Sequence, residues 1–312
     1  MSKRIVLIGA LIGVALALPS VVSAKDVTID GSKLFTESIS SDAAGNLYAG
    51  SLVGVIFRAT PGSDKAVAWI RPDDANKLKS LLGVLADDKS NTLWVCSIPG
   101  FGPPAAGAES AAVAFDLKTG AFKARYVLPG PNATCNDITV GQHGKVYIAE
   151  TSGGRIFSIA PDAKEVKLEV QDPQLSGIDG IAFAADNILY ANNTRQNTFF
   201  RVNRDGSGNY QSLTRLNVSM PLKGPDGLRL YKGNQLIEAE TGNNRIALLT
   251  ITGDNVDVKV LNDKAPGAAS VTHIGDTAYT VFGKMAYLMD PKLRDQDPGA
   301  FVITAVPITG AK

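Results

Sequence analysis

The chain has 312 residues, of which 45% are hydrophobic and 20% are charged, and its formal net charge is +1. This apolar content excludes disorder over most of the chain, and the even balance of charges argues against nucleic acid as a partner. Only two His and two Cys are present, which excludes a His-rich zinc site and a site built from two CxxC pairs.

The first 24 residues have the pattern of a secretory signal peptide. Lys3 and Arg4 precede an apolar run from residue 5 to residue 19, and small residues lead up to Ala24. The apolar run is shorter than the roughly 18 residues that a membrane anchor needs, and its flanks are typical of a segment that is removed on export. We therefore expect cleavage after Ala24, which leaves a periplasmic or secreted protein that is not attached to a membrane.

Short strand-like segments recur along residues 25–312. Six of them share one pattern of apolar residues, and they begin at Asn46, Thr92, Lys145, Asn187, Gln235 and Thr277. They follow one another at intervals of 42 to 53 residues, with further β-forming segments and Gly, Asn and Asp turns between them. Four strands per unit at this period indicate an all-β fold, a six-bladed β-propeller with four antiparallel strands per blade. We expect Asp26–Ile29 to complete the last blade; a pair of β-sandwiches is the alternative.

Polar residues recur at one place in this repeat. In a propeller the starts of the innermost strands line one mouth of the channel, and here these positions are Glu37, Leu82-Gly83, Asn136-Asp137, Asp179-Gly180, Asp226-Gly227 and Ser270-Val271. Any one Asp-Gly pair is typical of an ordinary turn. Several carboxylates that converge repel one another unless a cation lies among them, and an all-oxygen donor set suits Ca²⁺ better than Mg²⁺, Mn²⁺ or Zn²⁺. The recurrence therefore favours a metal site.

The motifs at these positions resemble those of the senescence marker protein/gluconolactonase family of calcium-dependent six-bladed propellers. The resemblance rests on Glu37, Cys135–Ile138, Ile178–Phe183 and Gly224–Leu228, and it extends over nearly all of the mature chain. It implies a divalent cation, usually Ca²⁺, at one mouth of the channel, and an activity that opens lactones.

The resemblance also implies a role for each matching residue. Glu37, Asp179 and Asp226 fall on metal-ligand positions. Asn136 falls on a position that binds either the substrate or the metal, and Asp226 falls on the position of the general base. Asp137 comes directly after Asn136 in an alternating strand, so we expect its side chain to turn away from the site and to support the structure around it.

Two features depart from the family's pattern. Asp179 stands where family members usually have Asn, and its additional negative charge should strengthen the binding of a hard cation. The second unit contains the apolar segment Ser80–Leu85 where the family has an Arg-rich region that contacts sugars. This segment favours a less polar lactone or a small ester as substrate.

These observations predict an exported hydrolase that opens a lactone or a small ester. A bound cation would polarise the carbonyl group, and Asp226 would take a proton from the attacking water at the channel mouth. Two alternatives remain: a propeller that binds a small ligand around a structural metal, and a non-hydrolytic enzyme, such as an isomerase or a condensing enzyme, on the same scaffold. We expect a small-molecule partner and a monomer or small homo-oligomer.

Two further features stay open at this level. Cys96 and Cys135 are 39 residues apart and would lie in an oxidising compartment after export, where they either form a disulfide or remain two buried thiols. The Pro- and Gly-rich segment Ser97–Gly107 cannot form a central strand. It is either a lid near the channel mouth or a surface loop.

Overall fold

The structure, a computed structural model, describes residues 25–101 and 107–308. The predicted signal peptide, residues 1–24, lies outside the described residues, as do residues 102–106 of the segment whose role as a lid or a surface loop was left open. The described chain folds almost entirely into β-strands, which confirms the all-β prediction. No helix within this part of the chain is long and apolar enough to cross a membrane.

Four of the sheets follow the predicted pattern of consecutive antiparallel strands. Three of these sheets have four strands, and the fourth has in addition a short edge strand, β18, which pairs in parallel with β22. The strands are β6 (Ser80–Asp87), β7 (Thr92–Ile98), β8 (Ala111–Asp116) and β9 (Phe122–Val127); β10 (Cys135–Val140), β11 (Val146–Glu150), β12 (Arg155–Ile159) and β13 (Lys167–Gln171); β14 (Ile178–Phe183), β15 (Leu189–Asn193), β16 (Thr198–Arg204) and β17 (Tyr210–Arg215); and β18 (Asn217–Val218), β19 (Pro225–Lys232), β20 (Gln235–Glu240), β21 (Arg245–Thr252) and β22 (Asn255–Asn262).

The remaining sheet joins the two ends of the described chain. It has eight strands in the order β2-β3-β4-β5-β1-β25-β24-β23. These are β2 (Thr36–Ser41), β3 (Leu47–Ser51), β4 (Ile56–Ala59), β5 (Lys65–Ile70), β1 (Val27–Ile29), β25 (Phe301–Pro307), β24 (Thr277–Phe282) and β23 (Ala268–Ile274). The pairing of Val27 with Ile303 confirms that the segment after the predicted cleavage site completes the last four-stranded unit. The first and last units are not separate as predicted, because the second edge of β1 pairs in parallel with β5, with Thr28 opposite Lys65.

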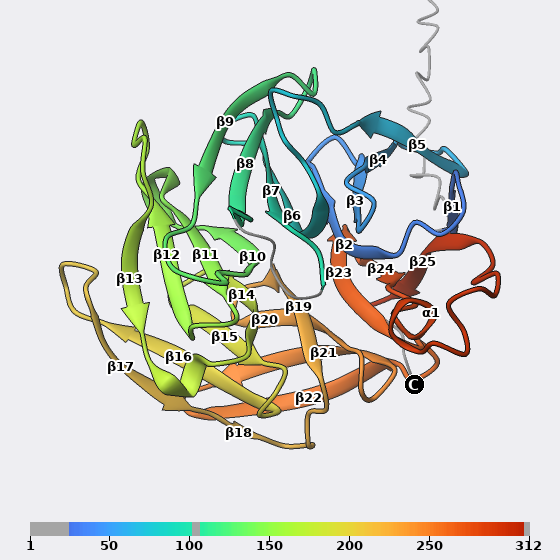
Figure 1. Ribbon diagram of the computed structural model, residues 1–312. Coiled ribbons are helices and arrows are strands. Elements are labelled where there is room, and N and C mark those ends of the chain that lie inside the picture. The colour runs from blue at the N-terminus through green and yellow to red at the C-terminus, as the bar shows by residue number, and fades with distance from the viewer. Residues whose placement is uncertain (1–24, 102–106, 309–312) are drawn as a thin grey trace, which may run out of the picture.

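The sheets stand around a common centre with their first strands innermost (Figure 1). These first strands contact one another in a closed cycle, β2, β6, β10, β14, β19, β23 and again β2, which is the arrangement of a β-propeller. Each inner strand is packed between two neighbouring sheets, so β14 has no exposed residue. The outer strand β22, in contrast, alternates exposed and buried residues from Asn255 to Lys259.

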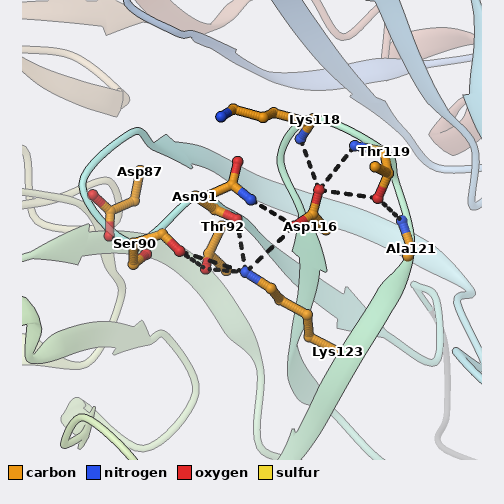
Figure 2. Close-up of polar contacts among 9 residues, drawn as sticks. All are labelled: Asp87, Ser90, Asn91, Thr92, Asp116, Lys118, Thr119, Ala121 and Lys123. Atoms are coloured by element: carbon orange, nitrogen blue, oxygen red, sulfur yellow. Dashed lines mark hydrogen bonds and ion pairs between the residues drawn. The ribbon is translucent and has the colours of Figure 1, made fainter.

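Polar side chains fix the turns between strands, as in the sheet formed by β6 to β9 (Figure 2). The Asp116 carboxylate accepts hydrogen bonds from the backbone N–H of Thr119 (2.9 Å) and of Lys118 (3.1 Å). The bonds from Thr119 are the main reason that the pKa of Asp116 lies below its ordinary value. Asn91, in the preceding turn, also donates to Asp116, and Lys123 Nζ donates to the Asn91 carbonyl oxygen (2.7 Å). The two turns are thereby tied together.

A disulfide joins Cys96 of β7 to Cys135 of β10. The two Cα atoms are 5.2 Å apart, and both side chains are fully buried. The bond therefore links two neighbouring sheets covalently, directly beside Asn136. Of the two alternatives that the sequence leaves open, the structure contains the disulfide.

Candidate metal centre

All four residues that the sequence proposes as ligands line one cavity. The cavity has a volume of about 160 Å³. Its lining residues are Glu37, Ser38, Gly83, Asn136, Asp137, Asp179, Asp226, Gly227, Ala269 and Ser270. Every one of the inner strands β2, β6, β10, β14, β19 and β23 contributes at least one of them, so the cavity lies at one end of the cycle of inner strands.

Irregular strand pairing aims these side chains into the cavity. The register of the inner strand with its neighbour shifts across Cys135–Ile138, Ile178–Ile181 and Pro225–Leu228, and it shifts at the same place in the other three inner strands. A β-bulge leaves residues unpaired and redirects their side chains. This explains why both Asn136 and Asp137 line the cavity. The prediction that Asp137 turns away was wrong, because strict alternation does not hold through a bulge.

Three glycines of the inner strands, two of which follow acidic residues, are required by close contact between these strands. A Cβ atom on Gly180 would collide with the backbone oxygen of Asp226, and one on Gly83 would collide with the backbone oxygen of Asn136. A Cβ on Gly227 would lie 2.7 Å from the Cα of Ser270. The Asp-Gly pairs are therefore parts of inner strands, where the missing side chain lets the next strand approach.

Burial and mutual repulsion raise the pKa values of the cavity's carboxyl groups. Burial, followed by the charge of Asp137, raises the pKa of Asp179 to about 7. Burial and the charge of Asp179 raise the pKa of Glu37 well above its ordinary value. The pKa of Asp226 is also raised well above its ordinary value, mainly by burial and then by Asp179 and Glu37. A cation bound among these carboxyl groups would offset their repulsion and lower their pKa values again.

The orientation of the Asn136 amide follows from its neighbours. The hydroxyl of Thr151 donates to the backbone oxygen of Ile178 (2.7 Å), so it accepts the hydrogen bond that it shares with Asn136 Nδ2 (2.8 Å). Asn136 is also hydrogen-bonded to Asp179. The amide nitrogen is thus committed to protein acceptors, and the carbonyl oxygen Oδ1 is the atom left for a cation.

The chemistry of the donor set suits a hard divalent cation. Glu37, Asp179 and Asp226 provide carboxylate oxygens and Asn136 provides an amide oxygen, whereas no His or Cys lines the described cavity. Oxygen donors of this kind are the ligands that Ca²⁺ and Mg²⁺ prefer. Over residues 25–101 and 107–308, no three His, Cys, Asp or Glu side chains form a group that could hold a metal as they stand. Binding would therefore need the carboxylates to move closer together.

An ion pair that the sequence analysis missed lies beside the cavity. Arg229 donates to both carboxylate oxygens of Asp137, at 2.8 and 3.0 Å, and to the backbone oxygen of Val84 at 3.1 Å. Asp137 also accepts from the backbone N–H of Ile181 at 3.1 Å. Both charged side chains are buried, and together they join four of the inner strands. Asp137 therefore has a structural partner, as expected, although it reaches the cavity wall.

The expected apolar wall of the substrate site is not present among the described residues. Of the segment Ser80–Leu85, only Gly83 lines the cavity. The side chains of Leu81, Leu82 and Val84 are buried in the packing between sheets. The prediction that this segment contacts a substrate was wrong, because the burial of β6 between two sheets accounts for its apolar residues.

Comparison with known proteins gives a family and several structural relatives. The family model SGL, described as SMP-30/Gluconolactonase/LRE-like region, matches residues 36–282. Among curated proteins none matches this chain.

Solved structures of distant relatives share the fold. The major Malassezia sympodialis allergen Mala s 1 is 15% identical, with a TM-score of 0.69 and coverage of 94% of this chain and 97% of the allergen. A luciferin-regenerating enzyme is 16% identical, with a TM-score of 0.65 and coverage of 92% and 98%. Virginiamycin B lyase from Staphylococcus aureus is 19% identical, with a TM-score of 0.58 and coverage of 84% and 82%. These likenesses concern the fold, whereas the family model spans most of the sequence: the chain belongs to the SMP-30/gluconolactonase/LRE-like family.

Proposed function

We propose that this protein is an exported hydrolase that uses a divalent cation, Ca²⁺ in the first place, to open a lactone or a small ester. The observation that carries the proposal is the convergence of Glu37, Asn136, Asp179 and Asp226 in one cavity. These residues are spread over 189 positions of the chain, from 37 to 226. A set of buried oxygen donors with raised pKa values is costly to assemble unless a cation compensates their charge. Membership of the SGL family supports an enzymatic role.

The proposal counts the fold as six blades. The eight-stranded sheet consists of two antiparallel four-stranded runs, β2 to β5 and β23 to β25 with β1, and only two residue pairs between β1 and β5 connect them. Counted as two blades, these runs and the other four sheets give six blades, each with its first strand at the centre. This arrangement supplies at least one lining residue per blade around the cavity, and every blade except the one that begins with β6 supplies a polar side chain.

The four donors share one task in the proposed reaction, and Asp226 has a second. Glu37, Asp179, Asp226 and the Asn136 carbonyl oxygen would hold the cation. When bound, the cation supplies polarisation of the substrate carbonyl and stabilisation of the negative charge that develops on its oxygen. A carboxylate oxygen of Asp226 accepts the proton of the attacking water. Asp226 and Glu37 keep part of their surface exposed, whereas Asp179 is buried. Of these two, Asp226 is the one that falls on the position of the general base in the family.

Export is supported by the disulfide. Cys96 and Cys135 are bonded, and such bonds persist in oxidising compartments such as the periplasm or the extracellular space. The proposed signal peptide ends at Ala24, so N-terminal sequencing of protein recovered from the periplasm or medium should begin at Lys25. A mature protein that retains Lys3 and Arg4 would contradict this part of the proposal.

A second candidate function is favoured by the size of the cavity. Even with the solvent at its open mouth counted, the empty space of about 160 Å³ is below the roughly 300–1,000 Å³ that is typical of small-molecule sites. A propeller in which the cation is structural, and a ligand binds elsewhere at the mouth, would need no larger space.

A metal-dependence assay separates the two functions. The purified protein is treated with a chelator, and hydrolysis of a panel of lactones and aryl esters is followed by pH-stat before and after Ca²⁺, Mg²⁺ or Mn²⁺ is added. We expect hydrolysis that is lost with chelator and restored by Ca²⁺. Asp226→Asn should lower kcat by about 10² to 10⁴-fold, while Asp186→Asn, at an exposed turn, should leave it unchanged. Calorimetric Ca²⁺ binding without hydrolysis of any substrate would favour the structural cation.

A further inference from the structure

Two polar residues lie at fully buried positions behind the cavity, where the neighbouring sheets have apolar residues. Glu238 of β20 is 0% exposed and stands opposite Leu228, the first residue after the bulge in β19. The residues at the corresponding positions of the three preceding sheets are Val95, Ile148 and Ala191. Asn192 of β15 is also 0% exposed, and it faces Glu238 from the adjacent sheet. Polar groups at such positions are costly unless they have a specific task.

Asn192 uses its whole amide group to hold the backbone of the candidate metal centre. Its Nδ2 donates to the backbone oxygen of Asp226 at 2.7 Å, and its Oδ1 accepts from the backbone N–H of Gly180 at 2.7 Å. Gly180 follows Asp179, so the two peptide groups belong to two candidate ligands on different strands. Both groups lie within bulges, where the regular strand pairing is interrupted. One side chain thus replaces missing strand-to-strand hydrogen bonds at both positions.

Glu238 determines which way the Asn192 amide points. Its Oε1 accepts the second N–H of Asn192 Nδ2 at 2.9 Å. An acceptor at this place excludes the flipped amide, which would set the Asn192 oxygen against Glu238 and against the backbone oxygen of Asp226. The other oxygen, Oε2, is buried with no hydrogen-bond partner among the described residues. Burial, and then the charge of Glu240, raise the pKa of Glu238 to about 8, and the carbonyl oxygen of the neutral acid remains an acceptor for Asn192.

We propose that Asn192 and Glu238 are positioning residues that hold the bulges of β14 and β19 so that Asp179 and Asp226 face the same cation. This inference rests on the proposed function in one respect, that a divalent cation binds in the cavity. The pair touches neither the cation nor a substrate; it acts through the backbone on either side of it. Partners of this kind commonly contribute about 10 to 100-fold to the affinity for a metal.

Cation binding tests the inference without any assay of activity. The dissociation constant for Ca²⁺ is measured by isothermal titration calorimetry for the wild type, Asn192→Ala, Glu238→Gln and Asn193→Ala. Asn193 is the matched control, because it is the next residue, has the same side chain, is also 0% exposed and bonds to the backbone oxygens of Gln174 and Ser176. Thermal melts of the cation-free proteins report the loss of stability separately.

The expected results distinguish positioning from general stability. Asn192→Ala should weaken Ca²⁺ binding at least about tenfold. Glu238→Gln, which keeps an acceptor at Oε1, should stay within about threefold of the wild type. Asn193→Ala should lower the melting temperature without a comparable change in affinity. If Asn192→Ala does not fold, Glu238→Leu is measured in its place and should also weaken binding, because the second N–H of the Asn192 amide then lacks its buried acceptor.

Three outcomes would overturn parts of the argument separately. Wild-type affinity in Asn192→Ala, or equal weakening by Asn193→Ala, overturns the positioning role. A wild type that binds no divalent cation overturns both the positioning role and the proposed function. Ca²⁺ binding that is weakened as expected, in a protein that hydrolyses no lactone or ester, retains the positioning role and rejects the hydrolase.

Discussion

Single glycines set the distance between neighbouring inner strands at the cavity. Gly180 has the backbone oxygen of Asp226 within 2.3 Å of the place where a Cβ would lie, so the residue that follows one candidate ligand packs directly on the peptide that follows another. No flexible side chain is available to yield there, because the colliding atom belongs to the backbone. The size of the cavity is therefore encoded in residues without side chains.

Gly180→Ala tests this requirement. The added methyl group has to displace the Asp226 backbone, so we expect the free energy of unfolding to fall by about 1–3 kcal/mol and Ca²⁺ affinity to fall with it. Gly206→Ala is the control, since a Cβ at Gly206 would meet no atom within 4 Å. Urea denaturation and calorimetry measure both quantities. Equal stability of the two variants would show that the inner strands are not in close contact.

The raised pKa values predict a pH dependence of cation binding. Asp179 has a pKa of about 7 in the cation-free protein, so binding at lower pH must displace a proton. The dissociation constant for Ca²⁺ should rise by about tenfold per pH unit below 7 for each proton displaced.

The stability of the cation-free protein should change with pH in the opposite direction to its affinity for Ca²⁺. The folded state holds more protons than the unfolded chain between about pH 4 and 7, so stability should decrease as the pH rises through this window. Calorimetry from pH 5 to 8 measures the affinity for Ca²⁺, and thermal melts over the same range measure the stability. A dissociation constant that does not change with pH would contradict the predicted proton displacement.

The candidate ligands could be read from the sequence, but their supports could not. Glu37, Asp179 and Asp226 recur at one place in a repeat, and a repeat is visible without coordinates. Arg229 and Glu238 each occur once in the repeat, and each acts through a partner on a different sheet. Their single signal is a charged residue at an otherwise apolar strand position, which sequence alone does not connect to any partner.

At the scale of strands, the bulges and the disulfide determine what the inner strands present. The order of strands within each unit followed from the alternation of apolar segments and turns. The sequence did not predict which way the side chains near the start of an inner strand point. A bulge reverses the alternation there, and it has no sequence signature of its own here. Asp137 was assigned to the wrong side for this reason, and the apolar segment in β6 was assigned to a substrate when its function is packing.

Removal of the disulfide should destabilise the protein without abolishing the fold. Cys96 and Cys135 are separated by 39 residues, and the chain-entropy model gives about 4 kcal/mol for a loop of this length. We expect Cys96→Ala/Cys135→Ala to melt on the order of 10 °C below the wild type. Ca²⁺ affinity should also fall, because Asn136 follows Cys135 directly. Treatment of the wild type with a reductant should lower its melting temperature by a similar amount. A double variant with the same melting temperature as the wild type would show that the disulfide does not contribute to stability.

At the scale of the whole molecule, a strand from one end of the described chain closes the ring. The seam, defined as β1 with its neighbours β25 and β5, holds Val27 and Ile29 at 5% and 1% exposure, whereas the Thr28 side chain between them is exposed. The sequence identified this strand and the unit it completes. The parallel pairing with β5 was not foreseen, because a strand of three residues carries no signal for a second partner.

Val27→Ala/Ile29→Ala tests the contribution of the seam. The two truncations remove buried methyl groups, and we expect them to lower the free energy of unfolding by about 3–6 kcal/mol. Thr28→Ala, at the exposed position between them, should change it by less than about 1 kcal/mol. Urea denaturation measures both. A double variant as stable as Thr28→Ala would show that the ring is held closed without β1.

The seam also imposes an order of events on synthesis. β1 is made first among the described strands, yet its antiparallel partner begins only at Phe301. Until synthesis has reached Phe301, Val27 and Ile29 have no antiparallel neighbour to cover them. The growing chain must keep this hydrophobic leading segment away from other chains, and the circle is completed only after β25 has been made.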